Sequence, residues 1–549
     1  MAMEAGVTWG APTRRMLAVW ALALALVAGI TPVTGGSSDS MAAVIVRAVP
    51  GALGAVERAV TAAGGTIVHR LGAMDTVTAR VPAASIPVLE GSAGVRGVVH
   101  DSRVQMLHHD TADTPTGDYG TAVNVAKMTR SRHAWARGLT GKGVGVALID
   151  TGIVPVAGLR TDDITSGPDL SPEAASDATR GLDTFGHGTH MAGLIAGGNG
   201  SAVRSALTSR KGHVGTAPDA ALLSVKVAGA DGATDVSQVL AAINWVIEHR
   251  NDDGRNIRVL NLSFGTDGVQ DYRLDPLTYA AEVAWRKGIV VVAAAGNAGF
   301  ASGKLTNPAY DPHILAVGAS DHHGTAGLGD DVVASFSSLG DGTRNADLLA
   351  PGRSIVSYRN ANSAIDAGNP SARVGERLFR GSGTSQAAAI TSGAVALLLQ
   401  QRPHLTPNQV KAILTSSARS LPAADAAGQG AGLIDVNKAL KTRTPVDKRQ
   451  PFEYATGTGS IEAARGSQRL SDGGDTINGE VDVFGNAWTG TTWSGTTWSG
   501  TTWSGTTWSG TTWSGTTWSG TTWSGTTWSG TTWSGTTWSG TTWSGTTWS

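Results

Sequence analysis

The segment VALIDTGI at residues 146–153 decides the fold, together with FGHGTHMAGLIAG around His187 and GSGTSQAAA around Ser385. The apolar residues before Asp150 predict a buried strand that ends at this carboxylate. His187 and Ser385 each stand at the start of a run of small residues that predicts a helix. A serine hydroxyl becomes a good nucleophile where an imidazole takes its proton and a carboxylate orients that imidazole. The three segments supply one residue of each kind.

A fourth segment, AAAGN at residues 293–297, follows the apolar run 289–292. In this order the four motifs resemble those of the subtilisin-like serine peptidases, whose catalytic residues follow one another as Asp, His and Ser. The resemblance covers roughly residues 120–440. It implies that the Asn297 side chain and the Ser385 backbone N–H donate hydrogen bonds to the oxyanion of the tetrahedral intermediate.

Each motif alone has other interpretations. His187 and His190 are three residues apart and could both bind a metal ion from one helical face, although no third ligand stands nearby. A strand that ends in an aspartate is also common in other α/β proteins. Ser385 does not lie in a G-x-S-x-G segment, which argues against an α/β-hydrolase. The joint occurrence of the four motifs favours a serine peptidase.

Strands and helices are expected to alternate over residues 120–440, the pattern of an α/β fold with a parallel sheet and helices on both faces. The expected strands are 145–150, 221–227, 259–263, 289–293 and 315–320, and the expected helices are 187–197, 237–249, 276–287, 385–401 and 406–416. Ligands bind at the carboxyl ends of the strands in such sheets. Asp150 and Asn297 both fall at strand ends, so one convergent site is expected.

The resemblance also implies where a substrate binds. Ser263, Phe264 and Gly265 would form one wall of the pocket for the residue before the scissile bond, and residues 229–234, with Gly232 and Ala233, would form a second edge strand. A peptide between them would add as a β-strand through main-chain hydrogen bonds, which explains broad specificity. A plain core strand and a surface turn remain the alternative.

Two stretches depart from the family pattern. After the serine the family has Met-Ala-x-Pro, whereas this chain has Gln386 followed by three alanines. Alanine is an excellent helix former, so the helix is expected to persist. The stretch between Asp150 and His187 is long and acidic. Structural calcium is possible there, but a solvated loop is favoured, and the chemistry requires no cofactor.

The N-terminal part predicts export and processing. Arg14 and Arg15 precede a 15-residue apolar run, so residues 1–36 read as a signal peptide, with an uncleaved anchor as the alternative. Residues 42–107 follow a β-α-β-β-α-β order that is ferredoxin-like and resembles the inhibitor propeptide of the family. Its end, about 104–108, would lie in the substrate cleft, and self-cleavage is expected between about Gln105 and Tyr119. A generic accessory domain is the alternative.

The C-terminal part is unusual in composition. Residues 441–487 read as a linker, and residues 488–549 repeat GTTWS with 13 of the 18 tryptophans and no charge. Three interpretations compete: stacked turns with packed indoles, a tail that binds cell-wall or other polysaccharide, and a low-complexity expansion without a role. The formal net charge of −1 gives no reason to expect nucleic acid as a partner, and the absence of cysteine excludes disulfides and thiolate sites.

Taken together, the sequence predicts a secreted, extracellular or cell-surface serine endopeptidase that acts on proteins or peptides and processes its own precursor. Ser385 attacks the carbonyl, His187 takes its proton, and Asp150 orients the imidazole. The propeptide is expected to act as an intramolecular inhibitor. The alternative is a non-catalytic exported protein that binds surfaces through its tryptophan-rich tail.

Overall fold

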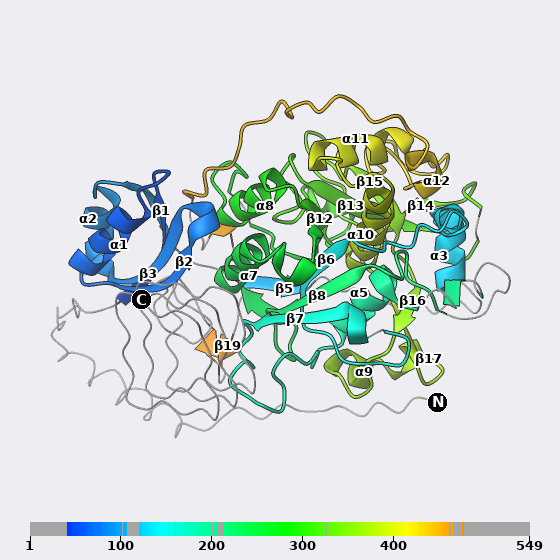
Figure 1. Ribbon diagram of the computed structural model, residues 1–549, viewed down its shortest axis with the longest axis horizontal. Helices are drawn as coiled ribbons and strands as arrows, with labels where there is room; N and C mark the ends of the chain where they lie inside the picture. Colours follow the sequence, from blue (N-terminus) through cyan, green and yellow to red (C-terminus); the bar gives the residue numbers. More distant parts are fainter. Residues whose placement is uncertain are drawn as a thin grey trace, which may run out of the picture. The chain divides into compact units, whose positions relative to one another are not determined.

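The structure is a computed structural model, drawn in Figure 1. It describes residues 41–100, 103–106, 120–159, 161–198, 202–203, 205, 213–268, 270–325, 327–459, 463–464, 471–472 and 475–476. The expected signal peptide and the GTTWS repeat lie outside these residues. Within the described part of the chain, no helix has the length and apolar character needed to cross a membrane.

A mostly parallel sheet forms the centre of the larger part of the chain. Its strand order is β14-β13-β12-β10-β6-β8-β7, and β15 pairs with β13. The strands are β6 Gly145–Asp150, β7 Ile164–Asp169, β8 Ala221–Lys226, β10 Ile257–Leu262, β12 Val290–Ala294, β13 Leu315–Asp321, β14 Val332–Val333 and β15 Leu348–Pro351. Only β14 runs antiparallel to its neighbour among these pairs. The prediction of an α/β fold with a parallel sheet is confirmed.

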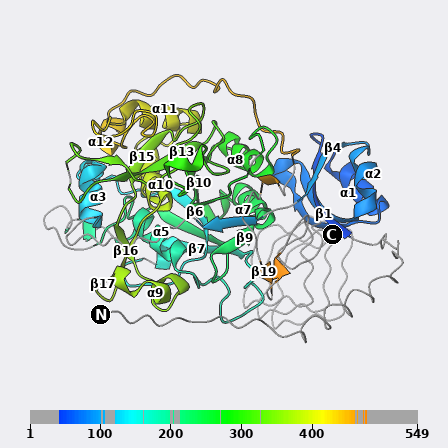
Figure 2. The ribbon, with the colours of Figure 1, turned by 180° about the vertical axis from the view of Figure 1, so that it is seen from behind.

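Helices pack on this sheet in two groups. The helices of this part are α3 Ala122–Met128, α4 Arg132–Trp135, α5 His187–Ala196, α7 Val236–Glu248, α8 Pro276–Arg286, α9 Ala364–Gly368, α10 Thr384–Gln401, α11 Pro407–Ser417 and α12 Val436–Ala439. Helix α10 packs against α5 and along β13, β10 and β12, whereas α7 and α8 pack against each other. Figure 2 shows α10 beside β10 and β6. The alanines after Gln386 are completely buried within α10.

The acidic stretch between Asp150 and His187 is not the single solvated loop that was favoured. Its residues 164–169 form β7, an edge strand that pairs in parallel with β8. The sequence pattern did not indicate this strand, because it contains Gly167 and Pro168, and both residue types are disfavoured in strands and tolerated mainly at sheet edges. Asp183 is also buried rather than solvated, with 2% of its surface exposed.

The N-terminal unit, residues 41–100, has its own antiparallel sheet of order β2-β3-β1-β4. Its elements are β1 Met41–Ala48, α1 Leu53–Ala62, β2 Thr66–Leu71, the 3-10 turn η1 Gly72–Met74, β3 Thr76–Pro82, η2 Ala83–Ser85, α2 Ile86–Glu90 and β4 Val95–His100. Valines such as Val44, Val56 and Val77 fill its core. Ile45 and Met74 instead join the hydrophobic core of the larger part, and η1 packs against α7 and α8.

Short strands and an extended segment complete the described chain. Strands β5 Arg103–Met106, β9 Ala233–Asp235 and β11 Phe264–Gly265 form one small sheet, and β16 Ile355–Tyr358, β17 Arg373–Val374 and β18 Leu378–Gly381 form another. A two-stranded pair joins β19 Ser471–Asp472 to β20 Asp475–Thr476. Residues 443–459 contain neither helix nor strand, in keeping with a linker composition. They are nevertheless docked on the folded core through hydrogen bonds such as that from Gln409 to the Pro445 carbonyl.

Candidate active site

Asp150 and His187 meet at the carboxyl end of β6. The Nδ1 atom of His187 lies 2.7 Å from Oδ1 of Asp150, and both side chains are almost completely buried. The backbone N–H of Thr151 donates to the same carboxylate oxygen at 2.8 Å. A carboxylate beside Nδ1 favours the tautomer with the proton on Nδ1, in which Nε2 is the nitrogen that can accept a proton.

The first turn of α5, which carries His187, is held by Asp183. Its carboxylate accepts hydrogen bonds from the backbone N–H groups of Gly186 at 2.6 Å and Thr189 at 2.8 Å. It also accepts the Thr151 hydroxyl at 2.7 Å. Burial raises the pKa of Asp183, against the effect of these hydrogen bonds. Sequence reasoning missed this role, although the short distance of Asp183 from the glycine before the helix was a signal for a cap.

Ser385 lies in the first turn of α10 and reaches the same edge of the sheet. Its hydroxyl donates to the Ser263 carbonyl at 3.0 Å. Ser263 follows the end of β10, and in the register of the sheet Leu262 pairs with Ile149, the residue before Asp150. The carbonyl that holds the Ser385 hydroxyl therefore lies beside the strand end that carries the Asp150–His187 pair. The structure brings all three side chains to one edge, as a single site requires.

Asn297 follows β12 and has one side of its amide occupied. Its Oδ1 accepts hydrogen bonds from the backbone N–H and the hydroxyl of Thr384, both at 2.9 Å. Only an oxygen can accept from a backbone N–H, so Nδ2 faces the other way. In the described part of the chain the buried Nδ2 atom has no hydrogen-bond partner. It is a donor that can meet a negative charge as the charge develops.

A segment of the chain itself lies between the two expected walls of the cleft. Strand β5 pairs antiparallel with β11 on one side, Met106 opposite Phe264 and Gln105 opposite Gly265. On its other side β5 pairs antiparallel with β9. Residues 103–106 thus add as the middle strand of a three-stranded sheet, the arrangement described above for a bound peptide.

The second wall depends on a glycine turn and on an ion pair between a buried lysine and a partly buried glutamate. Gly232 has φ +71°, and a Cβ atom there would lie 2.6 Å from the Phe185 ring. Glu173 accepts the Ala230 N–H at 2.9 Å through Oε1, and its Oε2 lies 2.6 Å from Nζ of Lys226. Ala233 follows this turn as the first residue of β9. Nothing in the sequence pattern paired Lys226 with a residue 53 positions away.

Lys226 also bears on the expectation of structural calcium in the acidic stretch. Its ammonium group donates hydrogen bonds to the Leu182 carbonyl at 2.5 Å, to the Thr179 carbonyl at 3.4 Å and to the Glu173 carboxylate. Carbonyl and carboxylate oxygens are the ligands that calcium prefers. At this position a side-chain cation of the chain already occupies them, so these residues do not fit a calcium ion.

The two histidines of the HGTH segment are not arranged as a ligand pair. The ring of His187 faces Asp150, whereas Nε2 of His190 lies 3.2 Å from the Phe379 carbonyl. Burial, and secondarily the nearby His187, lowers the pKa of His190 to about 3, so His190 remains neutral. Among the described residues, no cluster of three or more His, Cys, Asp or Glu side chains could hold a metal ion.

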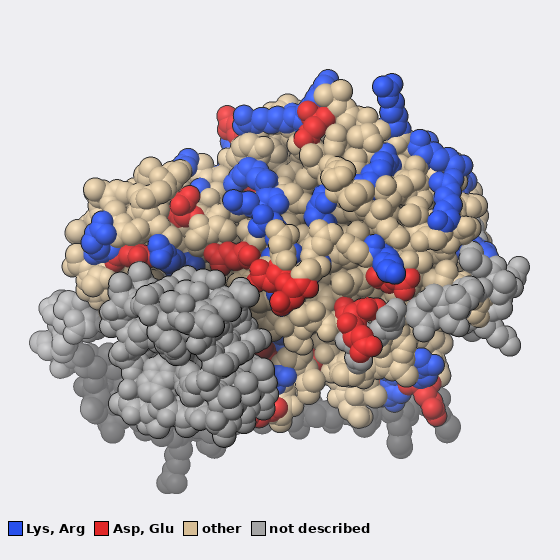
Figure 3. All heavy atoms as spheres, in the orientation of Figure 1, with Lys and Arg blue, Asp and Glu red and all other residues tan. Residues whose placement is uncertain are grey.

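The surface charges do not single out a charged ligand. Acidic and basic side chains both occur on the face drawn in Figure 3, and uncharged residues cover most of its described area. This agrees with a formal net charge of −1. Recognition of an extended peptide through its main chain requires no surface patch with charge of one sign.

Comparison with known proteins gives consistent matches. The model of the subtilase family, Peptidase_S8, matches residues 141–433, more than half of the chain. Serine protease AprX of Bacillus subtilis (strain 168) is 38% identical over 308 residues, which are 55% of this chain and 67% of AprX. Subtilisin Savinase of Lederbergia lenta is 33% identical over 310 residues, 56% of this chain and 93% of Savinase.

A solved structure supports the fold. The crystal structure of fervidolysin from Fervidobacterium pennivorans, described as a keratinolytic enzyme related to subtilisin, matches with a TM-score of 0.55. The two sequences are 23% identical, and the match covers 75% of this chain and 62% of fervidolysin. At this identity the likeness concerns the fold.

Proposed function

Because this chain belongs to the subtilase family of serine endopeptidases, we propose that Ser385 is its nucleophile, His187 its general base and Asp150 the residue that orients the base. The observation that carries the proposal is the 2.7 Å contact between Asp150 and His187 at the strand edge where the Ser385 hydroxyl is held. An acid, an imidazole and a hydroxyl at one edge supply the chemistry of acyl transfer.

Each proton has a defined path in this mechanism. The Ser385 hydroxyl leaves the Ser263 carbonyl, gives its proton to Nε2 of His187 and attacks the peptide carbonyl. Asp150 stays ionised and stabilises the imidazolium. His187 then protonates the leaving amine, whose departure leaves an acyl-enzyme. A water molecule then gives a proton to His187 and attacks the ester carbonyl. As the ester bond breaks, His187 returns that proton to the Ser385 oxygen, which regenerates the serine and the base.

The oxyanion is stabilised by donors that are in place before the reaction. Nδ2 of Asn297 and the backbone N–H of Ser385 donate to the carbonyl oxygen when it becomes negative. Thr384 fixes the Asn297 amide through two hydrogen bonds, so little reorganisation is needed at that moment. The positive end of α10 adds to this stabilisation.

The substrate class is extended polypeptide, bound between Ser263–Phe264–Gly265 and the Gly232–Ala233 edge. The pairing of β5 with both walls supports this assignment. Most of the contacts are main-chain hydrogen bonds, so the specificity is broad. Phe264 is completely buried and shapes the wall rather than reaching into solvent.

The same pairing supports a self-processing precursor, and the signal peptide expected at residues 1–36 supports export. Residues 42–107 act as an intramolecular inhibitor, because β5 fills the cleft that a substrate would need. The antiparallel register carries the chain toward Ser263 as it leaves Met106. Within the expected range from Gln105 to Tyr119, the cut therefore falls in the first peptide bonds after Met106.

Replacement of the nucleophile tests the proposal. Ser385→Ala is expected to abolish hydrolysis of a peptide substrate, labelling by a serine-directed reagent and processing of the precursor; in subtilisin itself loss of the serine lowers turnover about 10⁶-fold. Ser416→Ala, at an exposed serine of α11, is the matched control and should retain all three. Full labelling or full hydrolysis by the Ser385→Ala protein would show that another residue is the nucleophile.

A further inference from the structure

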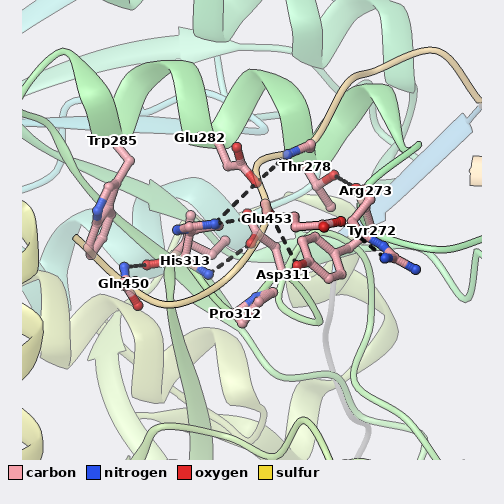
Figure 4. A network of polar contacts seen from close by, with 12 residues as sticks. Tyr272, Arg273, Thr278, Glu282, Trp285, Asp311, Pro312, His313, Gln450 and Glu453 are labelled. Carbon is pink, nitrogen blue, oxygen red and sulfur yellow. Dashed lines mark hydrogen bonds and ion pairs between the residues drawn. The ribbon is translucent and has the colours of Figure 1, made fainter.

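Residues 449–459, here called the C-terminal strap, form a docked segment on α8. Figure 4 shows this segment crossing beside α8, with the Gln450 side chain beside His313 and the largely exposed Glu453 side chain paired with Arg273. Gln450 donates to the His313 carbonyl at 2.7 Å. The carbonyl of Glu453 accepts the Tyr272 hydroxyl at 3.1 Å and lies 3.2 Å from Nε2 of His313. These contacts fix the middle of the strap.

The strap backbone is also bound at the start of α8. The N–H of Ala455 donates to the buried carboxylate of Glu282 at 2.8 Å. The N–H groups of Thr456 and Gly459 donate to the carbonyls of Arg273 and Leu274 at 2.6 and 2.7 Å. Three backbone N–H groups with protein acceptors within five residues describe a bound segment rather than a free linker.

The N-terminal unit binds the same helix through Tyr279. The Arg47 guanidinium lies 3.3 Å above the centre of the Tyr279 ring. The Tyr279 hydroxyl donates to the Met74 carbonyl at 2.9 Å. Both Arg47 and Tyr279 are buried, which strengthens a cation–π contact relative to an exposed one.

The strap and the N-terminal unit meet directly beside Tyr279. A Cβ atom at Gly97 of β4 would lie 2.9 Å from Cγ2 and 3.0 Å from Cβ of Thr458, and its three nearest atoms all belong to Thr458. Gly457 is packed on Tyr279 in the same way, with ring and Cβ atoms 3.0–3.1 Å from an ideal Cβ position. The close approach of the two segments thus depends on glycines at both positions.

Alternating cations and rings connect the two segments through α8. Arg286 lies 5.8 Å from the Tyr279 ring centre and 4.8 Å from that of Tyr454 in the strap. Arg449 lies 4.8 Å from the same Tyr454 ring. The strap therefore extends the surface on which Arg47 of the N-terminal unit is bound.

We propose that the C-terminal strap is a docking surface for the N-terminal unit of the same chain. The two segments stand before and after the catalytic residues in the sequence, and both contact α8. The strap keeps the N-terminal unit bound after the chain is cut beyond Met106. The inference rests on the proposed function for that cut.

A double-mutant cycle on the full chain tests the contact. Gly97→Ala inserts one carbon against Thr458 and is expected to release the N-terminal fragment from processed enzyme about tenfold faster, because an extra carbon in a filled contact is destabilising. Thr458→Gly removes the atoms in its way, so Gly97→Ala should then have no further effect. Val446→Ala, at a strap-proximal side chain that is 78% exposed, is the control. Release is measured by size exclusion and by the onset of peptide hydrolysis.

A second measurement does not depend on the cut. In full-length Ser385→Ala, hydrogen exchange at Thr456 and Gly459 should be faster with Gly97→Ala and unchanged by it when Thr458 is glycine. If the coupling is seen in Ser385→Ala but the parent chain with Ser385 is never cut, the processing is contradicted and the docking stands. An equal effect of Gly97→Ala in both backgrounds, or no effect on release and exchange, would overturn the docking.

Discussion

Asp183→Ala is expected to loosen the first turn of α5 and displace His187. The carboxylate is buried and accepts two backbone N–H groups, at Gly186 and Thr189, and the Thr151 hydroxyl. The α5 helix begins on Gly186, which has no side chain to serve as a cap. Asp183 therefore supplies from outside the helix the acceptor that its first turn lacks.

The size of the effect follows from the groups left without acceptors. Each buried N–H that loses its partner costs about 1–3 kcal/mol, so two of them would lower the free energy of unfolding by about 2–6 kcal/mol. Removal of a buried carboxylate, whose pKa is raised by burial, offsets part of this loss. We expect a net loss of about 3 kcal/mol. A misplaced base lowers turnover by about 10²-fold for a shift near 1 Å.

Unfolding by urea in the Ser385→Ala background measures the stability without self-digestion, and kcat and KM on a peptide measure the catalytic effect. Asp183→Asn keeps one acceptor oxygen and should fall between Asp183→Ala and the parent. Asp177→Ala is the control from the same stretch, since its side chain is 87% exposed. A loss below about 1 kcal/mol with unchanged kcat would refute the role given to Asp183.

Three further changes test other parts of the site and its support. Burial raises the pKa of Glu282 from the ordinary value of 4.5 to about 7, so the folded state holds this proton more tightly and stability should fall as pH rises from about 4.5 to 7. Glu282→Gln should flatten that fall in a melting series, and an unchanged slope would contradict it. Lys226→Met leaves Glu173 unpaired and should lower the free energy of unfolding by about 2–3 kcal/mol. It should affect KM more than kcat, and equal changes in both would speak against a role at the cleft edge. Asn297→Ala should lower kcat by the order of 10²–10³, as in subtilisin, with KM nearly constant; a loss confined to KM would exclude an oxyanion donor.

The elements of the central sheet could be predicted because their sequences obey a local rule. A strand buried on both faces reads as a continuous apolar run, and β6 was expected at the residues where it is found. The helices α5 and α10 begin within one residue of expectation, because glycines precede both. Strand β7 escaped prediction since it is an edge strand with half-exposed residues, for which no apolar run is needed.

The supporting polar contacts could not be predicted, because each joins residues far apart in the chain. Lys226 and Glu173 are 53 positions apart, and Tyr279 and Met74 are 205 apart. Neither residue of such a pair carries a local signal of its partner. The strap had the composition of a linker, and only the acceptors on α8 and in the segment just before it make its backbone N–H groups part of a bound segment.

Both helices that present reactive side chains begin after a glycine that offers no side-chain cap, and in both the missing acceptor comes from a residue outside the helix. For α5 it is Asp183, which also holds Thr151 beside Asp150. For α10 it is Asn297, whose Oδ1 accepts the Thr384 N–H. A side-chain cap from the helix's own N-cap residue would satisfy the helix and leave the catalytic side chains free to shift. Because the acceptors lie outside the helices and within the site, the stability of each helix is coupled to the position of the base or of the oxyanion donor. A mutation that loosens either helix must therefore also disturb the reaction.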